Sequence, residues 1–302
     1  MRVFVRPQRA GRLLATGIPI LVAALLVPSG TAFAGLLGPE VGASPNAESI
    51  RQLYYIIFAL ACLLFFGVAG LLVYMLVKFR ARKGVVAEQI HGNNRLEVGW
   101  TVGAALLLVV ISVVTLIKLP GIYNPPNSSA AGLPLTDANV LTSTGAREKL
   151  PPNRRALVIE VTGQLYAWRF TYEDGDGNNL NNVYAYEQMV VPTNTTVLLR
   201  IKSLDVAHSW WIPELGGKHD AVPGYTNFTW MKVTKPGTYR GQCAELCGRN
   251  HASMTARVHA IPPDEYQAWY NGQKERIREA DRLAAAERKA QAGQQTAAAT
   301  QQ

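Results

Sequence analysis

The chain has 302 residues, of which 48% are hydrophobic and 17% are charged. Soluble proteins usually carry about 25% charged residues, so the shortfall indicates that part of the chain lies in a membrane. The formal net charge is +9. The basic residues flank apolar runs or are mixed with acidic ones, so they form no concentrated basic face, which excludes a nucleic-acid partner.

Residues 1–34 have the three parts of a secretory signal peptide. Arginines come first, an apolar stretch follows over about residues 13–27, and Ala-Phe-Ala at 32–34 provides a cleavage site. The alternative is that this segment remains as a membrane anchor. If it is removed, the mature chain begins with a short exported segment, residues 35–52.

Two further apolar runs are long enough to cross a bilayer as helices, for which about 20 residues suffice. Residues 53–77 contain no charged side chain, and residues 98–119 contain only Lys118. The Lys and Arg residues between the runs place their connecting loop in the cytoplasm. We therefore predict a transmembrane helical hairpin over residues 53–119, with both ends outside; two buried helices of a soluble protein are the alternative.

The sequence after the hairpin predicts a linker, a β domain and a tail. Residues 120–153 are rich in Pro, Asn, Ser and Gly, which is typical of an irregular linker. Residues 154–262 alternate short β-type runs with Gly and Pro turns, which favours a β-sandwich or barrel. The predicted strands cover residues 156–163, 165–172, 188–192, 195–203, 228–233 and 255–261. Residues 263–302 are expected to be helical and then, over the last dozen residues, disordered.

One segment, residues 241–254, holds four side chains that bind metals: Cys243, Cys247, His251 and Met254. Thiolate, imidazole and thioether ligands together suit copper, whereas zinc sites rarely use methionine. A disulfide, with the His and Met as bystanders, is the alternative. His208, at the end of a predicted strand, offers a second imidazole. Two thiolates and two imidazoles favour a binuclear copper centre over a mononuclear one.

Four stretches of sequence resemble subunit II of cytochrome c oxidases. They are DVAHSW at 205–210, GGKHDAVPGY at 216–225, GQCAELCGRNHASM at 241–254 and HGNNRLEVGWT at 91–101, the last resembling the start of the family's second helix. The resemblance covers roughly residues 45–265. It implies a two-helix transmembrane hairpin followed by an all-β, cupredoxin-like sandwich that carries the binuclear copper centre called CuA.

The resemblance also implies the role of each ligand. Cys243 and Cys247 would bridge two copper ions, His208 and His251 would be terminal ligands, and Met254 would be a weak ligand. Glu245 would bind one copper through its backbone carbonyl. Its side chain would bind a magnesium ion at the interface with the catalytic subunit.

Three further residues resemble functional positions of the family. Tyr166 and Trp168 match the aromatic segment that receives electrons from cytochrome c, although Tyr166 stands where the family usually has Trp. Core packing is the alternative for both. Glu97 matches the glutamate at the mouth of a proton pathway; an ordinary interfacial carboxylate is the alternative.

The sequence also offers acidic residues for docking a basic cytochrome. The candidates are Asp205, Glu173, Asp174 and Asp176. Electrostatic steering needs a patch of one sign, and the copper domain is close to charge-balanced. The sequence therefore does not predict such a patch.

The resemblance implies that this chain is subunit II of an aerobic haem–copper oxidase in a bacterial plasma membrane, with its copper domain on the outer face. It would accept electrons from cytochrome c and pass them to the haem of the catalytic subunit I, where oxygen is reduced to water and protons are translocated. The chain has no Cys-x-x-Cys-His motif, so no c-type haem is expected in it. A membrane-tethered copper chaperone or a mononuclear copper electron carrier is the alternative.

Overall fold

The structure is a computed structural model of the chain. It describes residues 37–81, 83–84, 86, 89, 91–136, 140–145, 147–174 and 182–300, with side chains up to residue 292. The predicted signal peptide, residues 1–34, lies outside the described residues.

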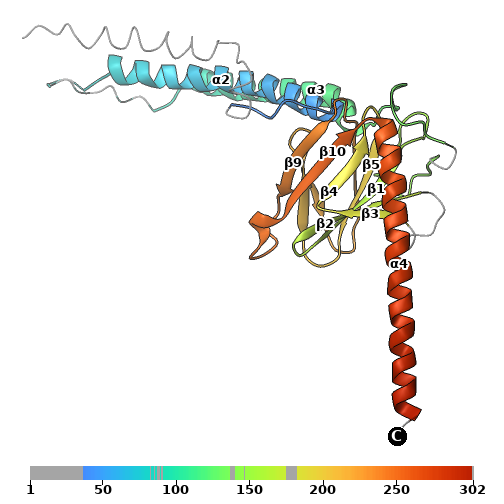
Figure 1. Cartoon of the computed structure of the whole chain (residues 1–302). Helices are drawn as coiled ribbons and strands as arrows, with labels where there is room; N and C mark the ends of the chain where they lie inside the picture. The colour runs from blue at the N-terminus through green and yellow to red at the C-terminus, as the bar shows by residue number, and fades with distance from the viewer. Residues whose placement is uncertain are drawn as a thin grey trace, which may run out of the picture. The chain divides into compact units, whose positions relative to one another are not determined.

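Two long helices form the predicted hairpin (Figure 1). Helix α2 is Pro45–Lys78 and helix α3 is Asn94–Tyr123. By length and composition both can cross a membrane, with mean hydropathies of 2.9 and 2.6. The Lys118 ammonium of α3 donates a hydrogen bond of 2.9 Å to the Gln52 side chain of α2. Figure 1 shows the two helices side by side.

Both helices begin before the apolar runs that predicted them. Pro45 occupies the first turn of α2, where its missing N–H costs nothing. Helix α3 begins earlier because the side chain of Asn93 accepts a hydrogen bond of 3.2 Å from the Leu96 N–H and so caps the helix. The polar first turns are thus started by a proline in α2 and by a side-chain cap in α3, which an apolar-run criterion does not detect.

The β domain is a sandwich of two five-stranded sheets, as predicted. The first sheet has the order β3-β2-β1-β5-β8 and the second β4-β10-β9-β6-β7. The strands of the first sheet are β1 Leu157–Gln164, β2 Ala167–Tyr172, β3 Val183–Tyr186, β5 Val197–Ser203 and β8 Asn227–Met231. Those of the second are β4 Gln188–Pro192, β6 His208–Trp211, β7 His219–Ala221, β9 Gly237–Cys243 and β10 Thr255–Ile261.

One hydrophobic core fills the space between the sheets. Strands β1 and β5 pair in parallel, with Ile159 opposite Leu199, and both side chains are buried. Phe170 of β2 and Val258 of β10 are also inaccessible to solvent. Burial of each such side chain contributes about 1.5–3 kcal/mol, so the core provides a rigid support for the loops between the strands.

Among the ten strands in the part of the chain that the structure describes, four were not predicted, namely β3, β6, β7 and β9. Strand β6 has three consecutive buried residues and therefore lacks the alternation that marks a half-buried strand. This corrects the expected place of His208: it does not end the predicted strand 195–203 but begins β6 in the opposite sheet. The intervening turn is fixed by Ser203, whose hydroxyl donates to the Val206 carbonyl at 2.5 Å.

Helix α4 runs from Pro263 to Thr300 and so occupies the segment in which a helix was expected. Its last residues include many alanines, which have the highest helix propensity. The first turns pack on the domain through Trp269 and Tyr270. Their rings lie 5.2 and 6.4 Å from the ring of Tyr172.

A buried ion-pair network fastens the linker to the first sheet. Glu148 of the linker accepts a hydrogen bond of 2.8 Å from the Arg200 guanidinium of β5. Arg200 also contacts Glu173 at 2.7 Å. Burial alone would raise the pKa of the Glu148 carboxyl, but the hydrogen bonds from Arg200 and Thr144 outweigh it and hold that pKa below its usual value.

Candidate metal centre

The five predicted ligand side chains come together at one end of the second sheet. Trp210 of β6 stands opposite Cys243 of β9 in the antiparallel ladder. This register brings the first residue of β6, His208, next to the loop that follows β9. The loop returns through the short 3-10 helix η3, His251–Ser253, into β10. A hydrogen bond of 2.9 Å from the Cys243 N–H to the Met254 carbonyl closes it.

The donor atoms form a compact chain. The two thiol sulfurs, of Cys243 and Cys247, are 3.9 Å apart, and both cysteines are free. The Cys243 sulfur lies 3.8 Å from Nδ1 of His208, and the Cys247 sulfur lies 3.6 Å from Nδ1 of His251. The Met254 sulfur lies 3.9 Å from the Cys247 sulfur. Each cysteine therefore has an imidazole of its own.

The cluster is enclosed by the domain. His208 is inaccessible to solvent, and Cys243 and Met254 are 2% and 1% exposed. Burial, together with the neighbouring Cys243, raises the pKa of the Cys247 thiol to about 11. The thiol is therefore protonated at neutral pH in the absence of a cation, so metal binding releases a proton from Cys247.

This donor set fits copper. Thiolate, imidazole and thioether ligands together favour copper. Calcium and magnesium prefer oxygen ligands, and zinc sites rarely include a thioether. The ligand atoms of His208, Cys243 and Cys247 lie within 4.8 Å of one another. The backbone carbonyl of Glu245 is a further donor, 3.3 Å from the Cys243 sulfur, while its side chain is exposed.

A carboxylate that the sequence did not single out as a site residue orients the His208 ring. Asp205 Oδ1 lies 2.9 Å from Nε2 of His208, and Oδ2 accepts a hydrogen bond of 2.6 Å from the Leu165 N–H. With Nε2 donating to Asp205, Nδ1 faces Cys243 with its lone pair. Such partners of a ligating histidine fix both its tautomer and its orientation.

Two glycines leave room for the side chains of His208 and Tyr166. A Cβ at Gly163 would stand 2.9 Å from Cδ2 of His208. Gly248 has φ +132°, and a Cβ there would stand 2.8 Å from the Tyr166 hydroxyl. The position after Cys247 therefore favours glycine both for its backbone angle and for its neighbour. In the sequence, the only sign of this close contact was that a glycine, Gly163, lies inside a predicted strand.

Replacing Asp205 with asparagine is expected to lower copper affinity about 10- to 100-fold, because the ring of His208 loses its charged partner while the shape of the residue is kept. Competition with a copper chelator measures this affinity. The matched control is Asp281→Asn on the exposed part of α4, which should leave the affinity unchanged. Equal affinities of Asp205→Asn and the control would contradict the orienting role.

The aromatic residues are placed differently from one another. Trp168 is completely buried and meets the ring of His208 edge-on, with centroids 5.9 Å apart. Tyr166 is half-buried in the turn between β1 and β2. Tyr166 precedes β2 and packs against the edge of the core, whereas Trp168, Phe170 and Tyr172 of β2 are fully buried in it.

Glu97 lies away from this cluster, in the first turn of α3. Its side chain is exposed, and Oε1 accepts a hydrogen bond of 3.2 Å from the Asn93 N–H. This contact, together with the Asn93 cap, is the reciprocal arrangement of a capping box. Glu97 thus has a clear structural role in starting the helix.

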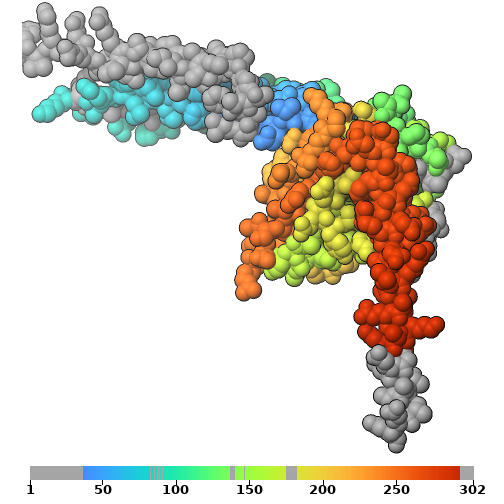
Figure 2. All heavy atoms as spheres, in the orientation of Figure 1, coloured from blue at the N-terminus to red at the C-terminus, as the bar shows by residue number. Residues whose placement is uncertain are grey.

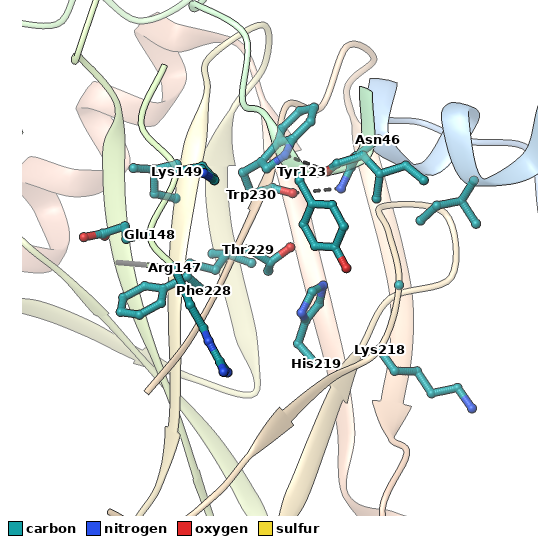
Figure 3. Close-up of a pocket in the computed structure, with 15 residues that line it drawn as sticks. Asn46, Tyr123, Arg147, Glu148, Lys149, Lys218, His219, Phe228, Thr229 and Trp230 are labelled. Atoms are coloured by element: carbon teal, nitrogen blue, oxygen red, sulfur yellow. Dashed lines mark hydrogen bonds between the residues drawn. The ribbon is translucent and has the colours of Figure 1, made fainter. Parts of the chain in front are cut away.

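A separate cavity of about 190 Å³ lies where the ends of α2 and α3 meet strand β8. Figure 3 shows Tyr123, Trp230 and the cationic side chains of Arg147, Lys149 and Lys218 around it. Burial lowers the pKa of His219 in its wall, although Asp220 opposes the shift. None of the predicted site residues lines this cavity.

Comparisons with known proteins point to one family. The family model described as cytochrome C oxidase subunit II, periplasmic domain, matches residues 164–261, and the model of its transmembrane domain matches residues 32–117. The chain is 32% identical to cytochrome c oxidase subunit 2 of Alkalihalophilus pseudofirmus, over 81% of this chain and 66% of that one. It is 30% identical to probable cytochrome c oxidase subunit 2 of Rickettsia bellii, over 77% and 82%.

A solved structure is also similar to part of the chain. The periplasmic domain of cytochrome oxidase subunit II from Bradyrhizobium japonicum matches with 30% identity and a TM-score of 0.37. The match covers 40% of this chain and 94% of that one.

Proposed function

Because the chain belongs to the cytochrome c oxidase subunit II family, we propose that its cysteine, histidine and methionine cluster is a binuclear copper centre that receives electrons outside the membrane. Electron transfer within a haem–copper oxidase is the role that follows from the family. Family membership implies copper in the β domain. We propose in addition that two copper ions bind there and that the clustered side chains are their ligands.

The pairing of each thiol with its own imidazole supports two copper ions rather than one. Cys243 stands beside His208, and Cys247 stands beside His251. A single ion would leave one of these pairs unused, with a buried thiol as a surplus donor. Two ions would be held by all four side chains, with Met254 and the Glu245 carbonyl as further ligands.

When bound, the copper pair supplies a one-electron redox couple. The protein holds the ligands on strand ends and on a loop closed by backbone hydrogen bonds, so their positions change little between redox states. The buried surroundings exclude water from the sulfurs, and Asp205 keeps Nδ1 of His208 directed at Cys243. Such outer contacts and the dryness of the site tune the redox potential.

The proposed electron path begins at cytochrome c and ends at the haem of subunit I. Tyr166 is half-buried on the donor side, and Trp168 contacts His208 inside the domain, so the two aromatics lead from the surface to a ligand. The exposed carboxylate of Glu245 would bind a magnesium ion at the interface with subunit I.

We place the chain in a bacterial plasma membrane, with α2 and α3 in the lipid and the copper domain on the outer face. Subunit I and other oxidase subunits would be its partners. Glu97, at the cytoplasmic end of α3, would mark the mouth of a proton pathway shared with subunit I. Protons would be translocated, and oxygen reduced to water, by the whole complex.

Copper loading of the full chain in detergent tests the proposal. Two copper ions per chain, with a seven-line hyperfine pattern in the electron paramagnetic resonance spectrum, are expected, because one unpaired electron is shared by two nuclei. A Cys62→Ser variant, which alters the cysteine outside the cluster, should give the same spectrum. One copper with a four-line spectrum would instead identify a mononuclear electron carrier or a copper chaperone.

A further inference from the structure

We propose that the outer face of strands β9 and β10 is an interaction surface for an acidic protein segment, which is bound by the facing arginines Arg240 and Arg257. The surface, called the arginine face below, consists of three pairs of side chains that stand opposite each other on the two strands: Gln242 and Thr255, Arg240 and Arg257, and Thr238 and His259. The inference goes beyond the proposed function and does not depend on the copper centre.

The burial pattern of the two strands places these side chains on the side away from the core. Tyr239 of β9 and Val258 of β10, which stand between members of the arginine face, are buried. Because successive side chains of a strand point to opposite faces, Arg240 and Arg257 point into solvent, and both are exposed. Figure 2 shows residues of β9 and β10, in orange, at the surface of the β domain.

The two guanidinium groups stand opposite each other without a partner of opposite charge. Within the part of the chain that the structure describes, neither side chain forms an ion pair or a hydrogen bond. Like charges directly opposite on antiparallel strands are destabilising. The neighbouring pair does form a contact, since Thr238 Oγ1 lies 3.0 Å from Nδ1 of His259. An anionic group bound from outside would remove the repulsion between the arginines.

The nearest acidic residues do not neutralise the pair. Among the strands given above, Asp220 on β7 is the only acidic residue of the second sheet. The register places it two strands and four positions from Arg240, a separation of about 16 Å. Glu187 is exposed at the bend before β4 and contacts neither guanidinium. Burial and the nearby Glu40 raise the pKa of Glu214, which therefore has no cation beside it.

The segments that flank the strands of the second sheet carry both signs of charge. Asp205 is turned toward His208, away from the arginine face. The other charged residues of these segments are Glu245, Asp264 and Glu265 with Lys218, Lys232, Lys235 and Arg249. Because long-range steering needs an excess of one sign, we expect none here. The arginine pair therefore acts at short range, by direct contact with a carboxylate.

The position of the pair in the sheet indicates a protein segment as the occupant. Strands β9 and β10 are inner strands, so they offer no free backbone edge, and the contact must be made by side chains. The cavity beside His219 includes neither arginine, so a small anion on this open face would stay hydrated and bind weakly. A protein segment excludes water and presents two carboxylates, each matched to the planar fork of one guanidinium.

Trp211 extends the arginine face toward β6. It stands opposite Gln242 and is partly exposed. The Lys218 ammonium lies 5.1 Å from the centre of its ring. Tryptophan and arginine are enriched among the residues that contribute most to protein–protein binding. The face therefore offers apolar contact beside the two charges, as a protein partner requires.

The first test measures the reaction of single arginines with phenylglyoxal by mass spectrometry, in the full chain in detergent with hexaglutamate as the probe. Hexaglutamate should slow the modification of Arg240 and Arg257 at least about fivefold, because charge-assisted contacts hold it there. Arg276 and Arg288, exposed on α4 without an ion pair, are the controls and should slow less than about twofold, since isolated surface charges bind weakly. Equal slowing at all four arginines would mean that no local site exists.

Two further probes test the class of ligand. Inorganic phosphate and vesicles containing anionic phosphatidylglycerol, at the same total negative charge, should protect Arg240 and Arg257 less than hexaglutamate does. Stronger protection by phosphate would identify a small-anion site, and stronger protection by vesicles a membrane contact; either result contradicts the proposal. In membranes that contain the assembled oxidase, the same two arginines should be modified at least about fivefold more slowly than in the isolated chain. Equal rates in both would leave the face without a partner and refute it.

A double variant tests the pair directly. Arg240→Gln combined with Arg257→Gln should weaken hexaglutamate binding at least about tenfold. It should also raise the unfolding temperature by about 1–5 °C, because the repulsion is removed. Arg276→Gln with Arg288→Gln changes the net charge equally and should alter neither quantity. Unchanged affinity in the first variant would overturn the proposal, and so would a lower unfolding temperature, since the pair would then stabilise the fold itself.

Discussion

Replacing Cys247 with serine is expected to reduce the copper content from two ions to one per chain and to lower cytochrome-dependent oxygen consumption more than about a hundredfold. Loss of an outer-shell partner already costs about 10- to 100-fold, and a bridging ligand should cost more. The serine hydroxyl is nearly the same size, but it does not supply a thiolate. Copper analysis and the paramagnetic spectrum measure the first effect, and the oxygen consumption of the purified oxidase measures the second.

The matched control for this variant is Cys62→Ser, because Cys62 is also a free cysteine but lies in α2, outside the cluster. It should retain both copper ions and the full rate. The fold should survive Cys247→Ser because the side chain sits in a loop after β9 rather than in the ladder. Retention of two copper ions by Cys247→Ser would show that this sulfur does not bridge them.

Replacing Glu148 with glutamine is expected to lower the free energy of unfolding of the β domain by about 1–3 kcal/mol, the cost of weakening one buried hydrogen-bonded pair, because Arg200 keeps Glu173 as a second carboxylate. The Glu148 side chain is 2% exposed and that of Arg200 is 15% exposed, so water cannot replace the lost partner. Thermal or denaturant unfolding of the full chain in detergent, followed by tryptophan fluorescence, measures the change.

The same pair makes stability depend on pH with a defined sign. The folded-state pKa of the Glu148 carboxyl is lowered, so the folded state binds its proton less readily than the unfolded chain, where the pKa is about 4.3. The stabilisation is fully present above that value and is lost as pH falls through the folded-state pKa. Glu148→Gln should therefore reduce the loss of stability seen on acidification.

An exposed ion pair provides the comparison. Glu279 and Arg282 on α4 lie 3.4 Å apart, with side chains 56% and 69% exposed. Glu279→Gln should change the free energy of unfolding by less than about 1 kcal/mol, because surface pairs contribute little. Equal effects of the two substitutions would mean that Glu148 does not gain its stabilising role from burial.

The sequence predicted the elements with clear apolar runs and missed three short strands and β9, whose seven residues include two glycines and few apolar side chains. Strands β1, β5 and β10 contain runs of apolar residues with clear β character, and each was predicted to within a few residues. Strands β6 and β7 have four and three residues, too few to show a period. Their conformation is imposed by pairing, of β6 with β9 and of β7 with β6, and the first of these joins distant parts of the chain.

The ligands themselves were readable because four of them share one short segment. His208 carries no pattern of its own, being more than thirty positions away, and was proposed because the segment lacks a second imidazole; the family resemblance then supported it. The role of Asp205 at the site depends on how the loop before β6 turns back on His208. The same holds for Gly163, which faces the His208 ring from the opposite sheet.

The two halves of the cluster lie on parts of the second sheet that differ in strength. Strand β9 is joined to β10 over six residue pairs, whereas β6 is joined to β9 over only two, and beyond β6 the sheet ends at β7. Local opening therefore begins more easily at the β6 edge, which carries His208, than at the loop that carries the two thiols. A cation held by both parts would cross-link that edge to the rest of the domain, so metal binding and local stability are thermodynamically linked.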